Sequence, residues 1–175
     1  APIDKDELLN NTSFSQVSKT SKKLVENYNI QVNPREINLF YLKDNLRERI
    51  IFENDVYKIN YTTIAFSEVE ILEEIKSYPD RFSPNVIMRP LYQETILPNL
   101  CYIGGGGELA YWFQLKNYFK KVNIPFPILL LRNSALLISN KQLFKLKKLN
   151  VNLIEIFLKQ EVLINEKVKE ISVIN

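Results

Sequence analysis

The sequence contains no histidine, a single cysteine and only four glycines among its 175 residues. Without histidine, the chain cannot form Ser-His-Asp or Cys-His catalytic groups, or a zinc site with a histidine ligand. Acid–base chemistry within this chain therefore falls to Asp, Glu, Lys, Tyr or Cys side chains. The single Cys101 cannot form an internal disulfide, which favours a reducing compartment. Its apolar neighbours favour a buried, inert thiol over a nucleophile.

Long apolar runs, a secretory signal and a strong charge of one sign are also missing. Apolar runs such as Ile128–Leu131 have the length of a strand, so no segment is expected to cross a membrane. The N-terminus lacks a basic region followed by an apolar one. The net charge of +3 is too small to indicate nucleic-acid binding. We therefore predict a cytoplasmic protein with no membrane or nucleic-acid partner and no metal site.

The first half of the chain shows helix signals on either side of a strand-rich region. Residues from about Lys5 to Tyr28 are predicted to form one helix. Ser67 and Glu70 form a capping box that begins another helix, which Pro79 ends. Between them, three runs rich in strand formers predict an antiparallel meander: Ile37–Leu42, Arg49–Phe52 and Val56–Ile59.

The second half alternates between strand and helix. Ser83-Pro84 predicts the start of a helix, and Arg89-Pro90 predicts a kink or a fresh start. Leu100–Ile103 and Pro127–Leu131 are expected to be buried strands, because both are wholly or largely apolar. The helix expected between them, Glu108–Lys121, has Gln114 on its polar stripe and Phe113 in its apolar body. Strand, helix and strand at this spacing predict a right-handed βαβ unit.

All four glycines are consecutive, Gly104–Gly107, between a predicted strand and a predicted helix. Glycine permits positive φ and lets a ligand approach the backbone, and a helix N-terminus favours carboxylates or phosphates. A plain tight turn between strand and helix is the alternative. Glu108 suits a ligand with an amine or sugar hydroxyls better than a bare phosphate, and Tyr111, one turn later, is expected to reach the same space.

Further polar residues are candidates for the same site. If the two predicted strands are parallel, Arg132 lies beside the glycines at the carboxyl edge of the sheet, where open α/β sheets bind ligands. Ser134 follows closely as a hydrogen-bonding group. Asn85, Arg89 and Gln93 recur at four-residue spacing, which on a helix gives one shared face. The alternative for Arg132 is a surface arginine, and the alternative for Asn85, Arg89 and Gln93 is a set of polar residues on a helix surface.

The region from Asn85 to Arg132 resembles the cysteine-adding enzymes of bacillithiol biosynthesis, the cysteine ligase family. That family has the pattern N…RPL-x-Q-[ED]…LP…Y-[IV]-[GA]-G-x-[GA]-E-x-A-Y-W…L and then P…R. The upstream residues 31–60 resemble members of the Bacteroidetes type. Gly106 stands where proline is more usual. The residues that match the pattern are Asn85, Arg89, Pro90, Leu91, Gln93, Glu94, Leu97, Pro98, Tyr102, Gly104, Gly105, Gly107, Glu108, Ala110, Tyr111, Trp112, Leu115 and Arg132.

The resemblance implies an α/β fold: a partial Rossmann-like parallel sheet, an antiparallel β-meander insert and C-terminal helices. It implies three segments: N-terminal helices plus the connecting meander over 1–80, a Rossmann-like core portion with the glycine loop over 81–140, and helices leading to a coiled-coil arm over 141–175. Family members are longer, with histidine-containing nucleotide motifs in their N-terminal half. This chain is therefore expected to be an internal piece, inactive alone.

By the same resemblance, the full-length protein is a ligase that adds cysteine to glucosaminyl-malate, with both molecules as small-molecule partners. It implies ATP or ADP as a cofactor of the full-length protein but none in this piece, and a homodimer through the coiled coil. The residues expected to contact substrate are Asn85, Arg89, Gln93, Gly104, Gly105, Gly106, Gly107, Glu108, Tyr111, Arg132 and Ser134. No catalytic residue is assigned. The alternative function is a non-catalytic α/β module that binds a nucleotide or another anion.

Overall fold

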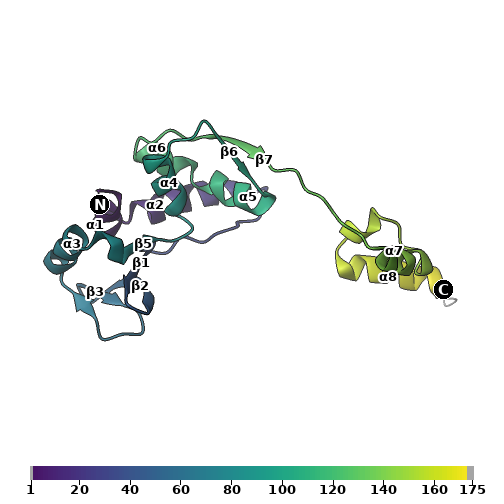
Figure 1. Ribbon diagram of the computed structural model, residues 1–175, viewed down its shortest axis with the longest axis horizontal. Coiled ribbons are helices and arrows are strands. Elements are labelled where there is room, and N and C mark those ends of the chain that lie inside the picture. Colours follow the sequence, from purple (N-terminus) through teal and green to yellow (C-terminus); the bar gives the residue numbers. More distant parts are fainter. Residues whose placement is uncertain (1, 173–175) are drawn as a thin grey trace. The chain divides into compact units, whose positions relative to one another are not determined.

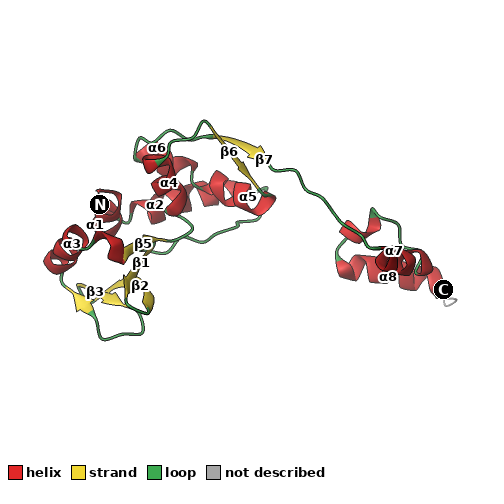
Figure 2. Ribbon diagram, viewed as in Figure 1, coloured by secondary structure: helices red, strands yellow, loops and turns green. Residues whose placement is uncertain are grey.

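The computed structural model describes residues 2–172 of the chain (Figure 1; Figure 2). It divides between Asn133 and Ser134 into two compact units. The first unit contains the antiparallel sheet, the parallel strand pair and six of the α-helices, and the second contains only helices. None of the helices in residues 2–172 is both long enough and apolar enough to cross a membrane.

The predicted N-terminal helix is in fact two helices, α1 (Pro2–Asn10) and α2 (Thr12–Leu24). Asn11 separates them, with a left-handed backbone at φ 49°. Asparagine tolerates this conformation better than most residues, which is why the break falls there. The break brings Ser13, at the start of α2, within hydrogen-bonding distance of Glu7 on α1.

The predicted meander is confirmed as part of a five-stranded sheet with the order β4-β3-β2-β1-β5. Positive φ at Asn54 and Asp55 suits the tight turn between β2 and β3. Ser83-Pro84 does not begin a helix, because Phe82–Pro84 pairs with β1 at the sheet edge, where proline is tolerated. The strands are β1 (Leu39–Lys43), β2 (Leu46–Glu53), β3 (Val56–Ile59), β4 (Ala65–Phe66) and β5 (Phe82–Pro84).

Two helices follow the capping signals in the sequence. In α3 (Glu68–Ser77), Ser67 and Glu70 form both halves of the predicted capping box. A short 3-10 helix, η1 (Pro79–Arg81), comes after it. The fresh start predicted at Arg89-Pro90 is confirmed by α4 (Arg89–Ile96), which has proline in its first turn.

The predicted strand–helix–strand unit with parallel strands is confirmed, and its right-handed connection stays a prediction. β6 (Cys101–Gly104) and β7 (Ile128–Leu131) are parallel, with Gly104 opposite Leu131. The single helix predicted between them is two, α5 (Gly106–Gln114) and α6 (Lys116–Lys121), which meet at Leu115. Figure 1 draws α2, α4 and α5 in the region between this pair and the antiparallel sheet.

The strand pair is not buried as expected. One of its faces packs on α5, where the rings of Tyr102 and Trp112 lie 4.4 Å apart. On the other face, Ile103, Ile128 and Leu130 are 64%, 66% and 51% exposed. The apolar sequence is typical of a strand covered on both faces, but in the described residues only one face is covered.

Helix α5 also differs from its predicted pattern. Gln114, expected on the polar face, is buried, and all its hydrogen-bonding groups are used inside the protein. Its Oε1 accepts from the backbone N–H groups of Gln31 and Val32, and its Nε2 donates to Ser21 Oγ and the Val32 carbonyl. Phe113, expected in the apolar body, is exposed.

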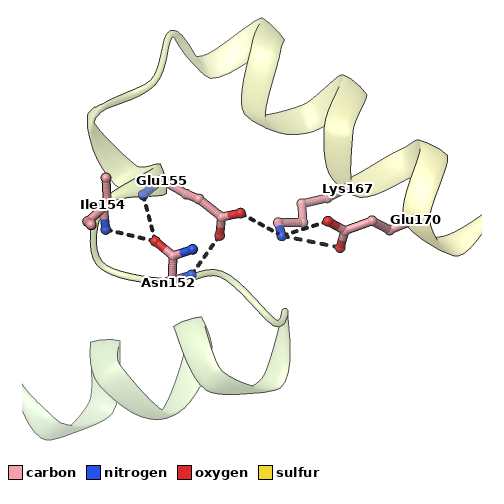
Figure 3. Close-up of polar contacts among 5 residues, drawn as sticks. All are labelled: Asn152, Ile154, Glu155, Lys167 and Glu170. Carbon is pink, nitrogen blue, oxygen red and sulfur yellow. Dashed lines mark hydrogen bonds and ion pairs between the residues drawn. The ribbon is translucent and has the colours of Figure 1, made fainter.

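The second unit contains α7 (Asn140–Lys148), η2 (Glu155–Phe157) and α8 (Gln160–Ile171). Asn152 and Glu155 form the expected reciprocal cap, but it begins a 3-10 turn rather than a helix (Figure 3). Lys167 joins this cap to α8 through ion pairs of 3.0 Å to Glu155 and 3.1 Å to Glu170. Residues 1 and 173–175 of the predicted segments lie outside the described residues, and the coiled-coil arm stays a prediction.

A buried carboxylate connects the elements of the first unit. Glu7 is 0% exposed, and its oxygens accept hydrogen bonds from the backbone N–H and Oγ of Ser13 and from the backbone N–H and Nδ2 of Asn38. Burial raises the pKa of Glu7, and the hydrogen bonds oppose that rise. Asn38 Oδ1 in turn accepts from Asn85 Nδ2 at 2.8 Å. One polar network thus joins α1, α2, the residue before β1 and the residues before α4.

We predict that Glu7→Gln lowers the free energy of unfolding by about 1–3 kcal/mol, because an amide NH₂ replaces one acceptor and leaves a buried donor unpaired. Urea denaturation at pH 7 measures this change. Glu73→Gln, at an exposed position of α3, is the matched control and is expected to stay within about 0.5 kcal/mol of the parent chain. Equal stabilities for the two variants would contradict the role of Glu7.

The same variant tests the raised pKa of Glu7. A carboxyl group whose pKa is raised on folding stabilises the protein fully below its ordinary value, and this contribution is lost as the pH rises through the folded-state pKa. Glutamine does not titrate. The stability deficit of Glu7→Gln is therefore expected to be largest near pH 4 and smaller at pH 7, whereas a constant deficit would mean that the pKa is not raised.

Candidate functional site

A cavity of about 820 Å³ lies in the first unit, between α4, α5 and the antiparallel sheet. This volume is typical of a pocket for a small metabolite. Its walls bring together five of the residues that the sequence singles out: Asn85, Arg89, Gln93, Glu108 and Tyr111. These residues come from the turn before α4, from α4 itself and from α5.

The glycine loop borders a second, more open hollow. Gly105, Gly106, Gly107 and Arg132 line this hollow. Glu108 and Tyr111 line both the hollow and the larger cavity, so the two adjoin along α5. The predicted position of Arg132 beside the glycines is correct, and its backbone N–H donates to the Gly104 carbonyl at 2.8 Å.

The glycines are not needed for positive φ, contrary to the sequence-based argument, because none of the four has it. Close packing explains the glycines at Gly104 and Gly105. A Cβ on Gly104 would lie 2.7 Å from Cε1 of Tyr102, and one on Gly105 would lie 3.1 Å from Nη2 of Arg132. A Cβ on Gly106 would meet nothing within 4 Å.

Glu108 folds back onto the loop. Its carboxylate accepts from the Gly105 N–H at 2.7 Å and from the Tyr102 hydroxyl at 3.3 Å. The Gly105 hydrogen bond is the main cause that lowers the pKa of Glu108, helped by Tyr102 and the charge of Arg132. Glu108 is therefore an anion at neutral pH, placed where the start of a helix favours negative charge.

Tyr111 and Trp112 complete this wall of the cavity. Burial raises the pKa of Tyr111, and Tyr102 and Glu108 add to the rise while the Trp112 indole opposes it. Tyr111 therefore stays a neutral hydroxyl at pH 7. Trp112 Nε1 is buried and has no hydrogen-bond partner of good geometry within residues 2–172.

Asn85 and Gln93 line the cavity but also have structural contacts. Asn85 Nδ2 donates to Asn38, and its Oδ1 accepts from the backbone N–H groups of Ile87 and Met88. Gln93 Nε2 donates to the buried Glu94 at 3.2 Å. Asn85 therefore holds the start of α4, and any contact between its side chain and a substrate stays a prediction.

Sequence reasoning missed three arginines on the opposite wall, Arg35, Arg47 and Arg49. Arg47 and Arg49 are two residues apart on β2, so a strand places both on the same face. Their alternation around Glu48 was the available signal, but the sequence does not show that α4 and α5 lie opposite this face. Ser134 belongs to the second unit, and its predicted role stays a prediction.

The loop does not suit a nucleotide phosphate. The Gly105 N–H is already bonded to Glu108, and that carboxylate places negative charge where a phosphate would bind. No step through ATP is therefore derived for these residues. In the part of the chain that the structure describes, no three His, Cys, Asp or Glu side chains gather as metal ligands would.

The fold and the site define the class of protein: a Rossmann-like α/β domain with an antiparallel sheet and a polar cavity between α4, α5 and that sheet. Residues 1–133 match the family described as bacillithiol biosynthesis BshC, N-terminal Rossmann-like domain. The chain belongs to this BshC family. Its position beyond the histidine-containing motifs of that family stays a prediction.

Relatives named "Putative cysteine ligase BshC" support this assignment. The chain is 58% identical to one from Flavobacterium johnsoniae, over 98% of this chain and 32% of the relative. The identity is 59% with one from Flavobacterium psychrophilum over the same shares, and 41% with one from Cytophaga hutchinsonii over 97% and 33%. These organisms fit the predicted Bacteroidetes type. The chain spans about a third of the length of these relatives.

We predict opposite effects for two substitutions in the glycine loop. Gly104→Ala is expected to cost about 1–3 kcal/mol, because the new methyl group meets the Tyr102 ring, which is held against Trp112. Gly106→Pro is expected to stabilise by up to about 1 kcal/mol. Gly106 is the first residue of α5, and Gly105 before it is extended at φ −69° and ψ 165°, as a residue before proline prefers.

Chemical denaturation of both variants beside the parent chain measures these changes. A Gly104→Ala variant as stable as the parent would show that the Tyr102 ring moves freely. A Gly106→Pro variant less stable than Gly106→Ala would show that the Gly106 N–H has a partner that the structure does not reveal.

Proposed function

We propose that this chain supplies part of the substrate pocket of a ligase that adds cysteine to glucosaminyl-malate in bacillithiol biosynthesis. The main observation is that the Glu108 carboxylate and the Arg89 guanidinium line one cavity. Glucosaminyl-malate carries an amine and sugar hydroxyls on one part and carboxylates on the other. The names of the relatives and the matched family support the pathway and the ligase class.

In this proposal, Glu108 and Tyr111 hold the glucosamine part. The lowered pKa of Glu108 keeps it ionised, so it can accept a hydrogen bond from an ammonium group or a hydroxyl. For the same reason it is a weak base, and we assign it to positioning the amine rather than to removing its proton. No catalytic base is assigned within the chain.

Arg89 holds a malate carboxylate in this proposal. It is the first residue of α4, where Asn85 fixes the backbone by accepting from the Arg89 N–H at 2.9 Å. A guanidinium matches a carboxylate with two parallel hydrogen bonds, which fixes orientation as well as position. In the same proposal Arg132, which lines the hollow beside the glycines, contacts a second anionic group, such as the carboxylate of the incoming cysteine.

The alternative function, a non-catalytic module that binds a nucleotide or another anion, is supported less well. Glu108 opposes a phosphate on the glycine loop, whereas it suits an amine. Use of ATP by the full-length protein, inactivity of this piece alone, a homodimer through a coiled coil and a cytoplasmic location all stay predictions.

We predict that Glu108→Gln and Arg89→Gln, made in the full-length protein that contains this chain, each lower kcat/KM for cysteine addition by at least about tenfold. Loss of one charged contact to the substrate accounts for an effect of this size. Mass spectrometry of the product, with glucosaminyl-malate and cysteine as substrates, measures the rate. Thermal melts of each variant separate loss of function from loss of folding.

Lys58→Gln is the control, because Lys58 lies on β3 and is not among the residues that line the cavity. Its rate is expected to match that of the parent enzyme. Normal product formation by both the Glu108 and the Arg89 variants would overturn the proposal.

A further inference from the structure

We infer that the antiparallel sheet supplies an anion-binding wall, formed by Arg35, Arg47 and Arg49 together with Arg89, for a ligand with two or more anionic groups. This inference rests on the proposed function only in using the same cavity. It adds residues and a charge requirement that neither the family pattern nor the sequence motifs include.

The four arginines reach the cavity from separate parts of the chain. Arg47 and Arg49 come from β2, Arg89 comes from the first turn of α4, and Arg35 comes from the segment before β1. The register of the sheet places Phe40 opposite Arg49, so these two side chains share a face. This face carries the arginines, whereas Tyr41 and Ile50 on the opposite face are buried in the core.

The positive charges on this wall are not neutralised by the protein. None of the ion pairs within residues 2–172 involves these four arginines. Among the described residues, Glu108 is the only carboxylate that lines the cavity, and it already accepts from Gly105 and Tyr102. Four guanidinium groups around one hollow repel each other, and a ligand with several negative charges removes that repulsion.

Parts of this wall are ordered before a ligand arrives, namely the side chain of Arg47 and the backbone at Arg35 and Arg49. The Arg35 backbone N–H donates to Asn38 Oδ1 at 3.0 Å, and the Arg47 guanidinium lies 3.9 Å from the centre of the Phe40 ring. The backbone of Arg49 is fixed by pairing in the middle of the sheet. Groups that are already ordered lose less entropy on binding, which favours affinity for a ligand of matching charge.

The cavity therefore has two chemically different walls. The arginine wall accepts anionic groups, and the wall with Glu108 and Tyr111 accepts hydroxyls or an amine. Dicarboxylates and phosphorylated groups share the chemistry that guanidinium recognises, so the test includes one of each.

The test titrates the chain with succinate, pyrophosphate and acetate at constant ionic strength and follows the melting temperature. We expect succinate or pyrophosphate to raise it and acetate to have no effect at the same concentration. A larger effect of succinate identifies a dicarboxylate ligand, and a larger effect of pyrophosphate identifies a phosphorylated one. The absence of a rise with both succinate and pyrophosphate, or an equal rise with acetate, would overturn the inference.

Variants test the residues directly. Arg47→Gln and Arg49→Gln are each expected to weaken the binding of succinate or pyrophosphate, whichever raises the melting temperature more, at least tenfold by calorimetry. Lys58→Gln removes one positive charge from the same sheet outside the cavity and is expected to change affinity less than twofold. Equal losses in all three variants would mean that only net charge matters, which would overturn the inference. Arg47 is exposed, so its variant remains informative if Arg49→Gln fails to fold.

The results also separate this inference from the proposed function. In one outcome, Arg47→Gln loses the binding of succinate or pyrophosphate, while Arg89→Gln and Glu108→Gln add cysteine normally. This outcome would support the arginine wall and reject the ligase role of the cavity. In the other outcome, Arg47→Gln and Arg49→Gln bind succinate or pyrophosphate normally, while the Arg89 and Glu108 variants lose cysteine addition. This outcome would reject the arginine wall and support the ligase role of the cavity.

Discussion

The carboxylate of Glu7 has no access to solvent, so its hydrogen-bond donors must come from within the first unit. They come from Ser13 and Asn38, so the start of α2 and the residue before β1 must both lie next to Glu7 on α1. A buried anion that lost these donors would cost far more than an ordinary surface contact. The break at Asn11 follows from the same constraint, because an unbroken helix would carry Ser13 away from Glu7.

The cavity depends on this network indirectly, through residues that contact both. Asn38 links Glu7 to Asn85, which holds the start of α4, and to the backbone of Arg35. Gln114 has a similar function on α5, since it accepts hydrogen bonds from the backbone of Gln31 and Val32 and so holds that segment against the helix. Buried amides and a carboxylate thus hold the two walls in place. Asn85 lines the cavity and belongs to this network, whereas the four arginines that line the cavity have no ion-pair partner within residues 2–172.

Features set by local sequence were predictable, and features set by distant contacts were not. The capping box at Ser67, the helix start at Arg89-Pro90, the meander and the parallel βαβ unit all follow from neighbouring residues. Ser83-Pro84 carries a valid helix signal, but pairing with β1 overrides it. Gln114 looks like a surface residue until its partners, more than 80 positions away in sequence, are known. Arg47 and Arg49 were predictable as a pair on one face, but not as a wall of the site.

The uncovered face of the β6–β7 pair also bears on how the chain behaves in solution. Ile103, Ile128 and Leu130 form an apolar surface on a two-stranded sheet whose outer edges have no strand neighbour among the described residues. Open strand edges beside exposed apolar side chains are a template for self-association. The chain therefore has a tendency to self-associate that is separate from its folding stability. The average molar mass measured by light scattering should rise with protein concentration even where the fold is intact.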